Sequence, residues 1–569
     1  IIMNRIWFIF VTSLLFLVLP VSSIRAQQWQ TQDLILQWGS TDVRYAREEV
    51  PTLEKRRQWK TSAWKGERVN AQAVLWTRKT LKNVRMAVSD LKCGKNVIPA
   101  SAATAGFVGY VWTDELNKDR KSGCSDRPDK AAWDSSLVAD VLEVRKSLDI
   151  EAHCTQPLWV NIWIPQDIPG GVYKGTLIVS GDDFADRSLP MEINVQKRTL
   201  PAPDQWAFHL DLWQNPYAVA RYYQVPLWSR QHFEIMEPLM RQLANAGQKV
   251  ITASVMHHPW AGQTEDPFDS MVFRMKKIDG SWVYDYTVFD RWVEFMMSLG
   301  IDRQINCYTL VPWALKFDYY DQATNRVRFV EAKPGEAAYE DYWFSFLKDF
   351  ARHLRQKGWF GKTTIAMDER EKSMMQKAFD LISRADAAYK VSGAGDYYPE
   401  IEPKMYDLCL AYGHTLPDSV REERRRSGKL STVYTCCIEA YPNTFTFSEP
   451  AEASWLIWHA VAGGYDGYLR WAYNSWTKDP LHDSRFRSWA AGDCYLVYPG
   501  SSSIRWEHLV EGIQDAEKIR ILRKEFSESG KSVELRKLNQ LVSGFMPEKL
   551  NGKNASQMVR NGRDLLNSF

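Results

Sequence analysis

The sequence predicts a β-sandwich followed by a (β/α)8 barrel, similar to a TIM barrel, and a helical C-terminal extension. Its 569 residues are too many for one simple core. Short alternating apolar runs broken by turn residues fill residues 27–200. Units of an amphipathic helix, a glycine and an apolar strand recur through residues 201–524. Residues 525–569 are patterned as helix, so we expect them to pack on the barrel.

The first domain is predicted from its strands and turns. Strands are indicated at 73–77, 158–164 and 175–179, where apolar and β-branched residues gather. The segment 169–171 reads Pro-Gly-Gly and is typical of a turn between the last two strands. Two prolines within 200–203 stiffen the junction with the barrel. An all-β sandwich is therefore expected ahead of the barrel.

The barrel is predicted from helices that end at a glycine just before a strand. Glycine is favoured there because it enters the left-handed conformation at low cost. An open doubly wound sheet is the competing fold, but no GxGxxG motif opens a helix. The expected helices are 234–246, 286–299, 342–357, 417–427 and 452–462, and the strands after them are 249–255, 304–310, 363–367, 430–436 and 467–472, with further strands at 208–213 and 407–412.

Charge and composition narrow the class of partner. Formal net charge is +3, from 72 basic and 69 acidic residues, and no basic stripe is present, so nucleic acid is a poor candidate. The chain contains 25 Trp and 25 Tyr, which suit a protein that stacks aromatic rings on the apolar faces of sugars. Core packing accounts for aromatic residues equally well, so composition alone does not separate the two interpretations.

The N-terminus is predicted to be a signal peptide, residues 1–26. A basic start precedes an apolar run at 6–19, and small residues precede Gln27. The run is short for a membrane span, which needs about 20 residues, and no later segment is apolar enough. We therefore expect a soluble protein exported to the periplasm, or further to the cell surface or medium, with no integral membrane segment after signal removal.

The eight cysteines are scattered and define no disulfide framework. Cys93 could pair with Cys124 or Cys154, although free thiols are equally compatible with the sequence. Cys436 and Cys437 are adjacent but lack the companions of a zinc site.

The candidate catalytic residues are Asp368 and Glu369, which directly follow the strand 363–367. Active sites of such barrels lie where strands end. Cleaving a glycosidic bond requires a proton donor and a group that stabilises positive charge at the anomeric carbon. One route uses separated carboxylates, for which Glu369 and Glu439 are candidates. The other uses the 2-acetamido group of the sugar, held by an acid beside the donor, and adjacent carboxylates suit this second route better. Stabilisation of the next helix by first-turn acids is the structural alternative.

Polar and aromatic residues at the other strand ends indicate a cleft for a neutral polyol. No metal or organic cofactor is expected, because His257 and its neighbour lack an HExxH frame and no phosphate-binding loop is present. The candidate substrate-binding residues are His257, Trp260, Tyr308, Trp313, Glu439, Trp471, Tyr473, Asn474 and Trp476.

The sequence resembles glycoside hydrolase family 123, the exported bacterial β-N-acetylgalactosaminidases, over nearly all of the mature chain. The blocks that carry the resemblance are 365–370, 467–476, 486–493, 498–500, 504–507 and 511–515. The resemblance implies a β-sandwich, a (β/α)8 barrel and an exo-acting, retaining enzyme that removes terminal β-linked N-acetylgalactosamine from glycans.

The resemblance also implies roles for individual residues. Asp368 would orient the acetamido group and stabilise an oxazolinium intermediate, and Glu369 would be the general acid and then the base. Tyr473 would contact the acetamido carbonyl. Two alternatives stay open: a two-carboxylate retaining glycosidase using Glu369 and Glu439 on a sugar without an acetamido group, and a glycan-binding protein without catalysis. The sequence does not indicate the oligomeric state.

Overall fold

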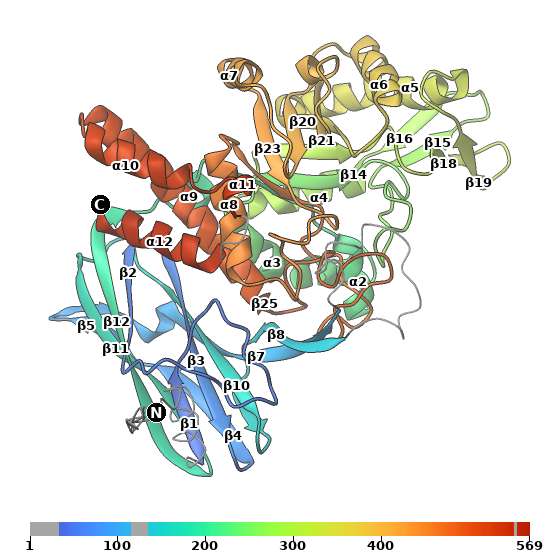
Figure 1. Cartoon of the computed structure of the whole chain (residues 1–569). Coiled ribbons are helices and arrows are strands. Elements are labelled where there is room, and N and C mark those ends of the chain that lie inside the picture. The colour runs from blue at the N-terminus through green and yellow to red at the C-terminus, as the bar shows by residue number, and fades with distance from the viewer. Residues whose placement is uncertain (1–32, 115–134, 551–554) are drawn as a thin grey trace, which may run out of the picture.

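The computed structural model describes residues 33–114, 135–550 and 555–569. Two β-sheets lie at one end of the molecule and a parallel barrel at the other, with the C-terminal helices beside both (Figure 1). The predicted fold class is therefore confirmed: a β-rich N-terminal region precedes a nearly closed eight-stranded barrel. The segment predicted as a signal peptide lies outside the described residues. Within the described part of the chain, no helix has the length and apolar character needed to span a membrane.

The N-terminal region consists of two sheets around a common core. Residues such as Trp38, Val160 and Leu177 are fully buried between them. The predicted strands 73–77, 158–164 and 175–179 correspond to parts of β3, β10 and β11. One sheet has the order β1 (Leu34–Trp38), β3 (Arg68–Thr77), β10 (Thr155–Trp163), β7 (Ala103–Thr113), β8 (Ser136–Glu143), β25 (Ser502–Ser503). The other has the order β2 (Trp59–Lys65), β12 (Phe184–Thr199), β11 (Gly171–Gly181), β4 (Leu81–Val88), β9 (Leu148–Ile150). The short strand β5 (Leu91–Cys93) pairs with β11 and with β6 (Asn96–Ile98) at the side of this second sheet.

The barrel is built from eight parallel strands. They lie in the order β13 (His209–Leu212), β24 (Gly467–Arg470), β23 (Leu430–Tyr434), β22 (Asp407–Ala411), β21 (Lys390–Gly395), β20 (Thr363–Met367), β17 (Gln304–Tyr308), β14 (Val250–Ser254). The ring closes between β13 and β14 through a single bridge, in which the Lys249 amide donates to the Leu210 carbonyl at 3.0 Å. This short closure leaves the barrel nearly, but not fully, hydrogen-bonded around its circumference.

Helices connect seven of the eight strands to the next element. They are α2 (Pro216–Tyr223), α3 (Arg230–Ala244), α4 (Thr287–Ser298), α5 (Ala337–Gln356), α6 (Lys372–Ala385), α7 (Asp418–Arg426), α8 (Ala451–Ala462) and α9 (Ile504–Glu528). The exception is the connection from β21 to β22, which has only a 3-10 helix at Glu402–Lys404. The repeat therefore departs from an ideal (β/α)8 pattern at its fifth unit.

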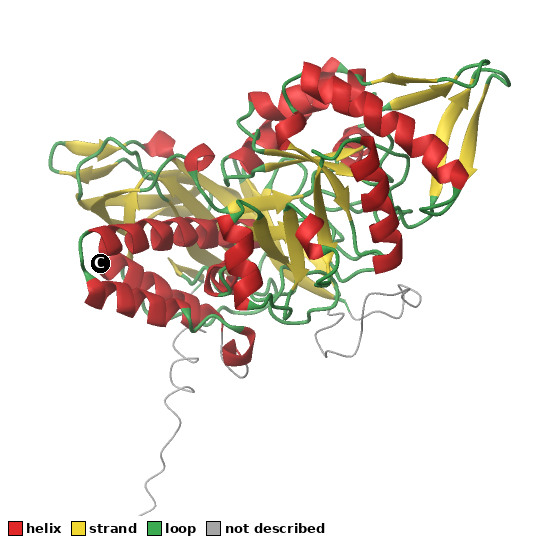
Figure 2. Ribbon diagram, turned by 90° about the horizontal axis from the view of Figure 1, so that it is seen from above, coloured by secondary structure: helices red, strands yellow, loops and turns green. Residues whose placement is uncertain are grey.

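A small four-stranded sheet is inserted in the barrel connections and was not predicted. Its order is β16 (Trp282–Asp285), β15 (Phe273–Lys276), β18 (Lys316–Asp321), β19 (Arg326–Glu331), and it derives from the loops after β14 and β17. Figure 2 shows it at the opposite side of the barrel from the C-terminal helices. Its strands have only four to six residues and few of these are buried, so each gives a weak signal in the sequence.

The C-terminal helices pack on both domains. The boundary predicted at residues 524/525 falls inside the 25-residue helix α9. This helix continues into α10 (Ser532–Val542), and α11 (Pro547–Leu550) and α12 (Ala555–Ser568) follow. Apolar residues of α9, α10 and α12 surround Trp455 and Trp458 of α8, and Trp64 of β2 joins the same cluster. The extension therefore binds the barrel and the β-rich region together.

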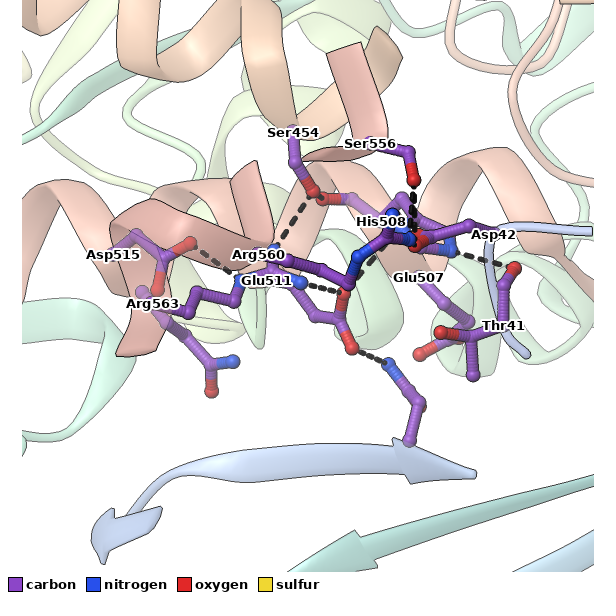
Figure 3. Close-up of polar contacts among 12 residues, drawn as sticks. Thr41, Asp42, Ser454, Glu507, His508, Glu511, Asp515, Ser556, Arg560 and Arg563 are labelled. Atoms are coloured by element: carbon purple, nitrogen blue, oxygen red, sulfur yellow. Dashed lines mark hydrogen bonds and ion pairs between the residues drawn. The ribbon is translucent and has the colours of Figure 1, made fainter. Parts of the chain in front are cut away.

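Polar contacts fix the same junction (Figure 3). The Arg563 guanidinium of α12 bonds Glu511 and Asp515 of α9, each at 2.8 Å. The side-chain amide of Asn70 in β3 donates to the other Glu511 oxygen at 2.8 Å. One strand and two helices thus share a network centred on a single carboxylate.

The described cysteines do not form the suggested Cys93–Cys154 pair, because both are free thiols. Cys124 lies outside the described residues. Cys437 is in a disulfide bond, which the sequence analysis did not predict.

Candidate active site

The two candidate acids lie at the carboxyl end of the fourth barrel strand. All five residues of β20 are buried, since neighbouring strands cover its sides and its apolar residues face the core. Asp368 and Glu369 follow at once, where the chain leaves the sheet. Gly395 ends the neighbouring strand β21 at φ +135°, and a Cβ there would lie 3.6 Å from the Glu369 Cα. A glycine at this position lets β21 turn away beside Glu369.

The acids open into a cavity with two lobes that share Glu369 and Tyr434. The first, here called the tryptophan lobe, has a volume of about 320 Å³. Its walls include Trp213, Trp260, Trp313, Trp471 and Trp489, with Asp368 and Glu369 at one side. The second, here called the acidic lobe, has a volume of about 510 Å³. Its walls include the carboxylates Glu369, Glu371, Asp396 and Glu439 and the tyrosines Tyr398, Tyr412 and Tyr434.

Asp368 is held by two N–H groups. The Glu369 amide donates to Oδ1 at 2.9 Å, and the Trp313 indole donates to Oδ2 at 3.2 Å. The Arg370 guanidinium lies 4.4 Å from the Trp313 ring centroid, which steadies the indole by a cation–π contact. Burial raises the pKa of Asp368, and these donors and the Arg370 charge oppose that rise. The carboxylate is therefore oriented with fixed geometry.

Glu369 is placed to hold a proton. Burial raises its pKa, and the negative charges of Asp368, Asp396 and Glu439 raise it further. The Tyr434 hydroxyl donates to Oε1 and opposes the rise. A carboxyl group with a raised pKa at the junction of two cavity lobes has the properties of a general acid.

The far wall of the tryptophan lobe is anchored by a buried ion pair. The Trp471 indole donates to Asp493 Oδ2 at 3.0 Å, and Arg470 donates to Asp493 Oδ1 at 2.6 Å. Arg470 also bonds Asn443 at 2.7 Å. Burial raises the pKa of Asp493 to about 6, with the Arg470 charge opposing. The indole of Trp471 is thereby fixed relative to the barrel.

The floor of the same lobe is aromatic. Trp213 packs against Tyr308 with ring centroids 4.5 Å apart and ring planes tilted by 53°, and Trp260 lies 5.1 Å from Trp213. This arrangement offers flat apolar surfaces beside two acids, and the volume of the lobe, about 320 Å³, suits a single sugar ring.

Family profiles match both parts of the chain. The profile described as the glycoside hydrolase 123 catalytic domain matches residues 213–522, and that of the glycoside hydrolase 123 N-terminal domain matches residues 38–181. The chain belongs to glycoside hydrolase family 123.

A solved structure agrees with this assignment. A family 123 glycoside hydrolase from Clostridium perfringens, described in a study of glycolipid glycan hydrolysis, is 25% identical with a TM-score of 0.84. The match covers 94% of this chain and 98% of that one. A Bacteroides ovatus GH5 xyloglucanase is 9% identical at a TM-score of 0.28, covering 84% and 100% of the two chains, which is too remote to carry an argument. No curated protein matches the sequence.

Several predicted residues of this family 123 glycoside hydrolase lie at the cavity. Asp368, Glu369, Trp260, Trp313 and Trp471 line the tryptophan lobe. Glu439 lines the acidic lobe, where its Oε2 accepts from the Cys436 amide at 2.8 Å. Tyr308 is buried and lines neither lobe, but it packs against the lobe tryptophans Trp213 and Trp260.

Three predicted residues after β24 point elsewhere, which corrects the expectation that they contact substrate. The Tyr473 hydroxyl donates to the Leu239 carbonyl of α3 at 2.9 Å, and its ring packs on Trp506. Asn474 exchanges two hydrogen bonds of 2.9 Å with the backbone of Asn215. The buried Trp476 indole donates to the Val497 carbonyl at 2.8 Å. These side chains join the loops after β13 and β24 to surrounding helices.

His257 lies in the loop after β14 and does not line either lobe. Its Nδ1 is 3.0 Å from Asp269 Oδ1, and its ring stacks on His258 with centroids 3.5 Å apart. Its ring also faces Phe329 of the small sheet at 6.1 Å. The prediction that His257 binds substrate has no support from this placement.

Several residues that line the cavity were not among the predicted site residues. Trp213 and Tyr434 end or follow barrel strands, a position that could have identified them. Trp489 and Gln263 come from long loops, and the Trp489 indole donates to the Gln263 carbonyl at 2.8 Å. No local pattern marks such a contact between segments 226 residues apart.

Proposed function

We propose that this glycoside hydrolase removes terminal β-linked N-acetylgalactosamine with retention, using the acetamido group of the substrate as nucleophile. The observation that carries the proposal is the adjacent pair of acids in a lobe the size of one sugar. Among the described residues that line the tryptophan lobe, Asp368 and Glu369 are the only carboxylates. A lobe without a separated second acid favours a nucleophile supplied by the substrate.

The two acids divide the work. Asp368 accepts the acetamido N–H, which directs the acetamido oxygen to the anomeric carbon and stabilises the oxazolinium positive charge. Glu369 protonates the departing glycosidic oxygen. It then takes a proton from the water that attacks the anomeric carbon and opens the oxazolinium ring. Its raised pKa favours the protonated form that the first step requires.

The geometry gives less support to the two-carboxylate alternative. Glu439 lies in the acidic lobe, and one of its oxygens accepts a hydrogen bond from the Cys436 amide. A nucleophile must reach the anomeric carbon of a sugar bound between the tryptophans, and Asp368 is the acid in that wall. Membership of a hydrolase family argues against the purely glycan-binding alternative.

The aromatic walls support a sugar with an apolar face. The galacto configuration rests on the family resemblance, and the glycolipid glycan acted on by the Clostridium perfringens relative is a consistent substrate class. Exo action rests on the family resemblance, and a lobe with the volume of about one sugar ring is consistent with it.

The test compares aryl β-N-acetylgalactosaminide, β-N-acetylglucosaminide and β-galactoside with wild type and Glu369→Gln. We expect cleavage of the first substrate above the others and its loss in the variant. Nuclear magnetic resonance of the first product anomer should show retention. Equal cleavage of the plain galactoside would contradict the acetamido route and make Glu439 the next residue to test.

We also propose that residues 1–26 direct export to the periplasm. The basic start and apolar run of the sequence support this. Expression of the full chain in a Gram-negative host, followed by N-terminal sequencing of periplasmic protein, should give Gln27 as the first residue. Recovery only of uncleaved cytoplasmic protein would contradict it.

A further inference from the structure

The acidic lobe adjoins the tryptophan lobe and shares Glu369 and Tyr434 with it. If a terminal sugar occupies the tryptophan lobe, the bond that Glu369 protonates lies at the junction, and the leaving group enters the acidic lobe. This placement rests on the proposed function. The lobe has room for a further sugar ring, and Tyr398, Tyr412 and Tyr434 provide aromatic surface and hydroxyl groups.

The charges around this lobe are predominantly negative. Glu369, Glu371, Asp396 and Glu439 line it, against one arginine and one histidine. The arginine, Arg370, stacks its guanidinium on Trp313 in the other lobe. The histidine, His414, has its Nδ1 3.4 Å from Asp396 Oδ1.

We propose that the acidic lobe is a leaving-group site for a neutral sugar and that it rejects a negatively charged one. A neutral hexose can donate hydroxyl hydrogen bonds to Asp396 and Glu439. The carboxylate of a hexuronic acid would instead approach several like charges in a partly desolvated cavity. Each such approach weakens binding, by about tenfold for a pair near 6 Å at an effective dielectric constant near 40.

The selectivity also fits the catalytic acid. Asp396 and Glu439 contribute to the raised pKa of Glu369, after burial and Asp368. A carboxylate on the leaving sugar would repel the negative charge that Glu369 acquires when it gives its proton to the leaving oxygen. Proton transfer to that oxygen would therefore be less favourable. The same side chains therefore keep the acid protonated and select a neutral neighbour.

The experiment measures kcat/KM for three substrates: the β-N-acetylgalactosaminide of a neutral hexose, that of a hexuronic acid, and an aryl β-N-acetylgalactosaminide. We expect the neutral disaccharide to be cleaved at least about tenfold better than the anionic one at low ionic strength. The ratio should shrink in about 0.5 M NaCl, which screens exposed charges.

Variants connect this ratio to the lobe. Asp396→Asn should reduce the preference for the neutral disaccharide severalfold, and Glu371→Gln provides a second charge removal if the first variant fails to fold. Asp418→Asn is the matched control, because this carboxylate is on the outer helix α7 and 86% exposed. Its ratio should equal that of the wild type.

The outcomes separate the two proposals. Aryl cleavage together with equal rates on the two disaccharides, or a preference for the anionic one, overturns the inference alone. A neutral preference that neither Asp396→Asn nor Glu371→Gln reduces also overturns it. Loss of all three activities in folded wild type overturns the proposed function and this inference with it.

Discussion

Two groups of buried carboxylates occupy this barrel, and they differ in what surrounds them. Asp368 and Glu369 stand at a strand end and face a cavity. Asp211 and Asp407 point into the barrel interior from β13 and β22 and are sealed there. Burial raises the pKa of Asp211 to about 7, so a carboxyl with a raised pKa occurs in each group.

The interior group has only protein partners. Asn306 donates to Asp211 Oδ2 at 3.1 Å, and Gln304 donates to Asp407 Oδ2 at 2.8 Å. His209 Nε2 lies 3.4 Å from the same Asp407 oxygen. Neither aspartate lines one of the two lobes described above. The difference teaches that a raised pKa reports burial, and that access to a cavity decides which acid can meet a substrate.

Replacing Glu369, the proposed proton donor at the cavity, should have the largest effect on turnover. In Glu369→Gln we expect kcat on a disaccharide to fall about 10³-fold, because the leaving oxygen loses its proton donor. The thermal unfolding midpoint should stay close to that of wild type, since the amide keeps the shape of the side chain. Steady-state kinetics and calorimetry measure both, and a fall of less than about tenfold in folded protein would contradict the assignment.

Replacing its neighbour should have the next largest effect. Asp368→Asn removes the negative charge that stabilises the oxazolinium and leaves a weaker acceptor for the acetamido N–H, so we expect kcat on an N-acetylgalactosaminide to fall about 10²-fold. The corresponding variant in the interior group, Asp211→Asn, should change kcat less than about twofold. Equal losses in the two variants would show that the distinction between cavity and interior acids is wrong.

Replacing Trp313, whose indole donates to Asp368, should reduce kcat/KM by a smaller factor. Trp313→Phe keeps an aromatic wall but removes the N–H donor, and we expect kcat/KM to fall about tenfold. Trp112→Phe, in β7 of the N-terminal region with the tryptophan 44% exposed, is the matched control. A Trp313→Phe enzyme as active as this control would exclude a role for the hydrogen bond to Asp368.

The interior group should make the free energy of unfolding depend on pH. The folded pKa of Asp211 is about 7 and its ordinary value is 3.8, so the folded state keeps a proton that the unfolded state loses between these values. Its contribution to the free energy of unfolding therefore decreases as pH rises from about 4 to 7 and then levels off. The raised pKa of His209, which is due to its partner Asp407 against burial, acts in the same direction, with stability lost as pH rises through the folded pKa.

Urea unfolding at about pH 5 and about pH 8 tests this sign. Relative to wild type, Asp211→Asn should gain about 2–4 kcal/mol in free energy of unfolding between the two pH values. A difference that is independent of pH would contradict the raised pKa, because it would mean that Asp211 is ionised in the folded protein at both pH values.

Much of the barrel could be predicted from local sequence. The strand 363–367 matches β20, and the helices expected at 286–299 and 452–462 match α4 and α8 within two residues. The glycine after each helix marks where the next strand begins, and this signal needs only neighbouring residues. The pair Asp368–Glu369 could be located for the same reason, because it directly follows a clear strand.

Residues whose role depends on distant segments could not be assigned in this way. Tyr473 and Trp471 are two residues apart after β24, yet one packs on α3 and α9 and the other faces the cavity. Both are aromatic, so composition does not distinguish them. The strand β21 and the small sheet were missed because their strands are short or rich in small or exposed residues.

The sequence by itself determined the fold class, the order of most helices and strands, and the position of the two adjacent acids. These follow from patterns with periods of two to four residues and from glycines at helix ends. The tertiary structure decided which tryptophans form the cavity, that Glu369 stands between two lobes, and that Tyr473 turns away. Those results depend on the packing of segments far apart in the chain, where steric fit and hydrogen-bond partners choose among side chains that look equivalent in sequence.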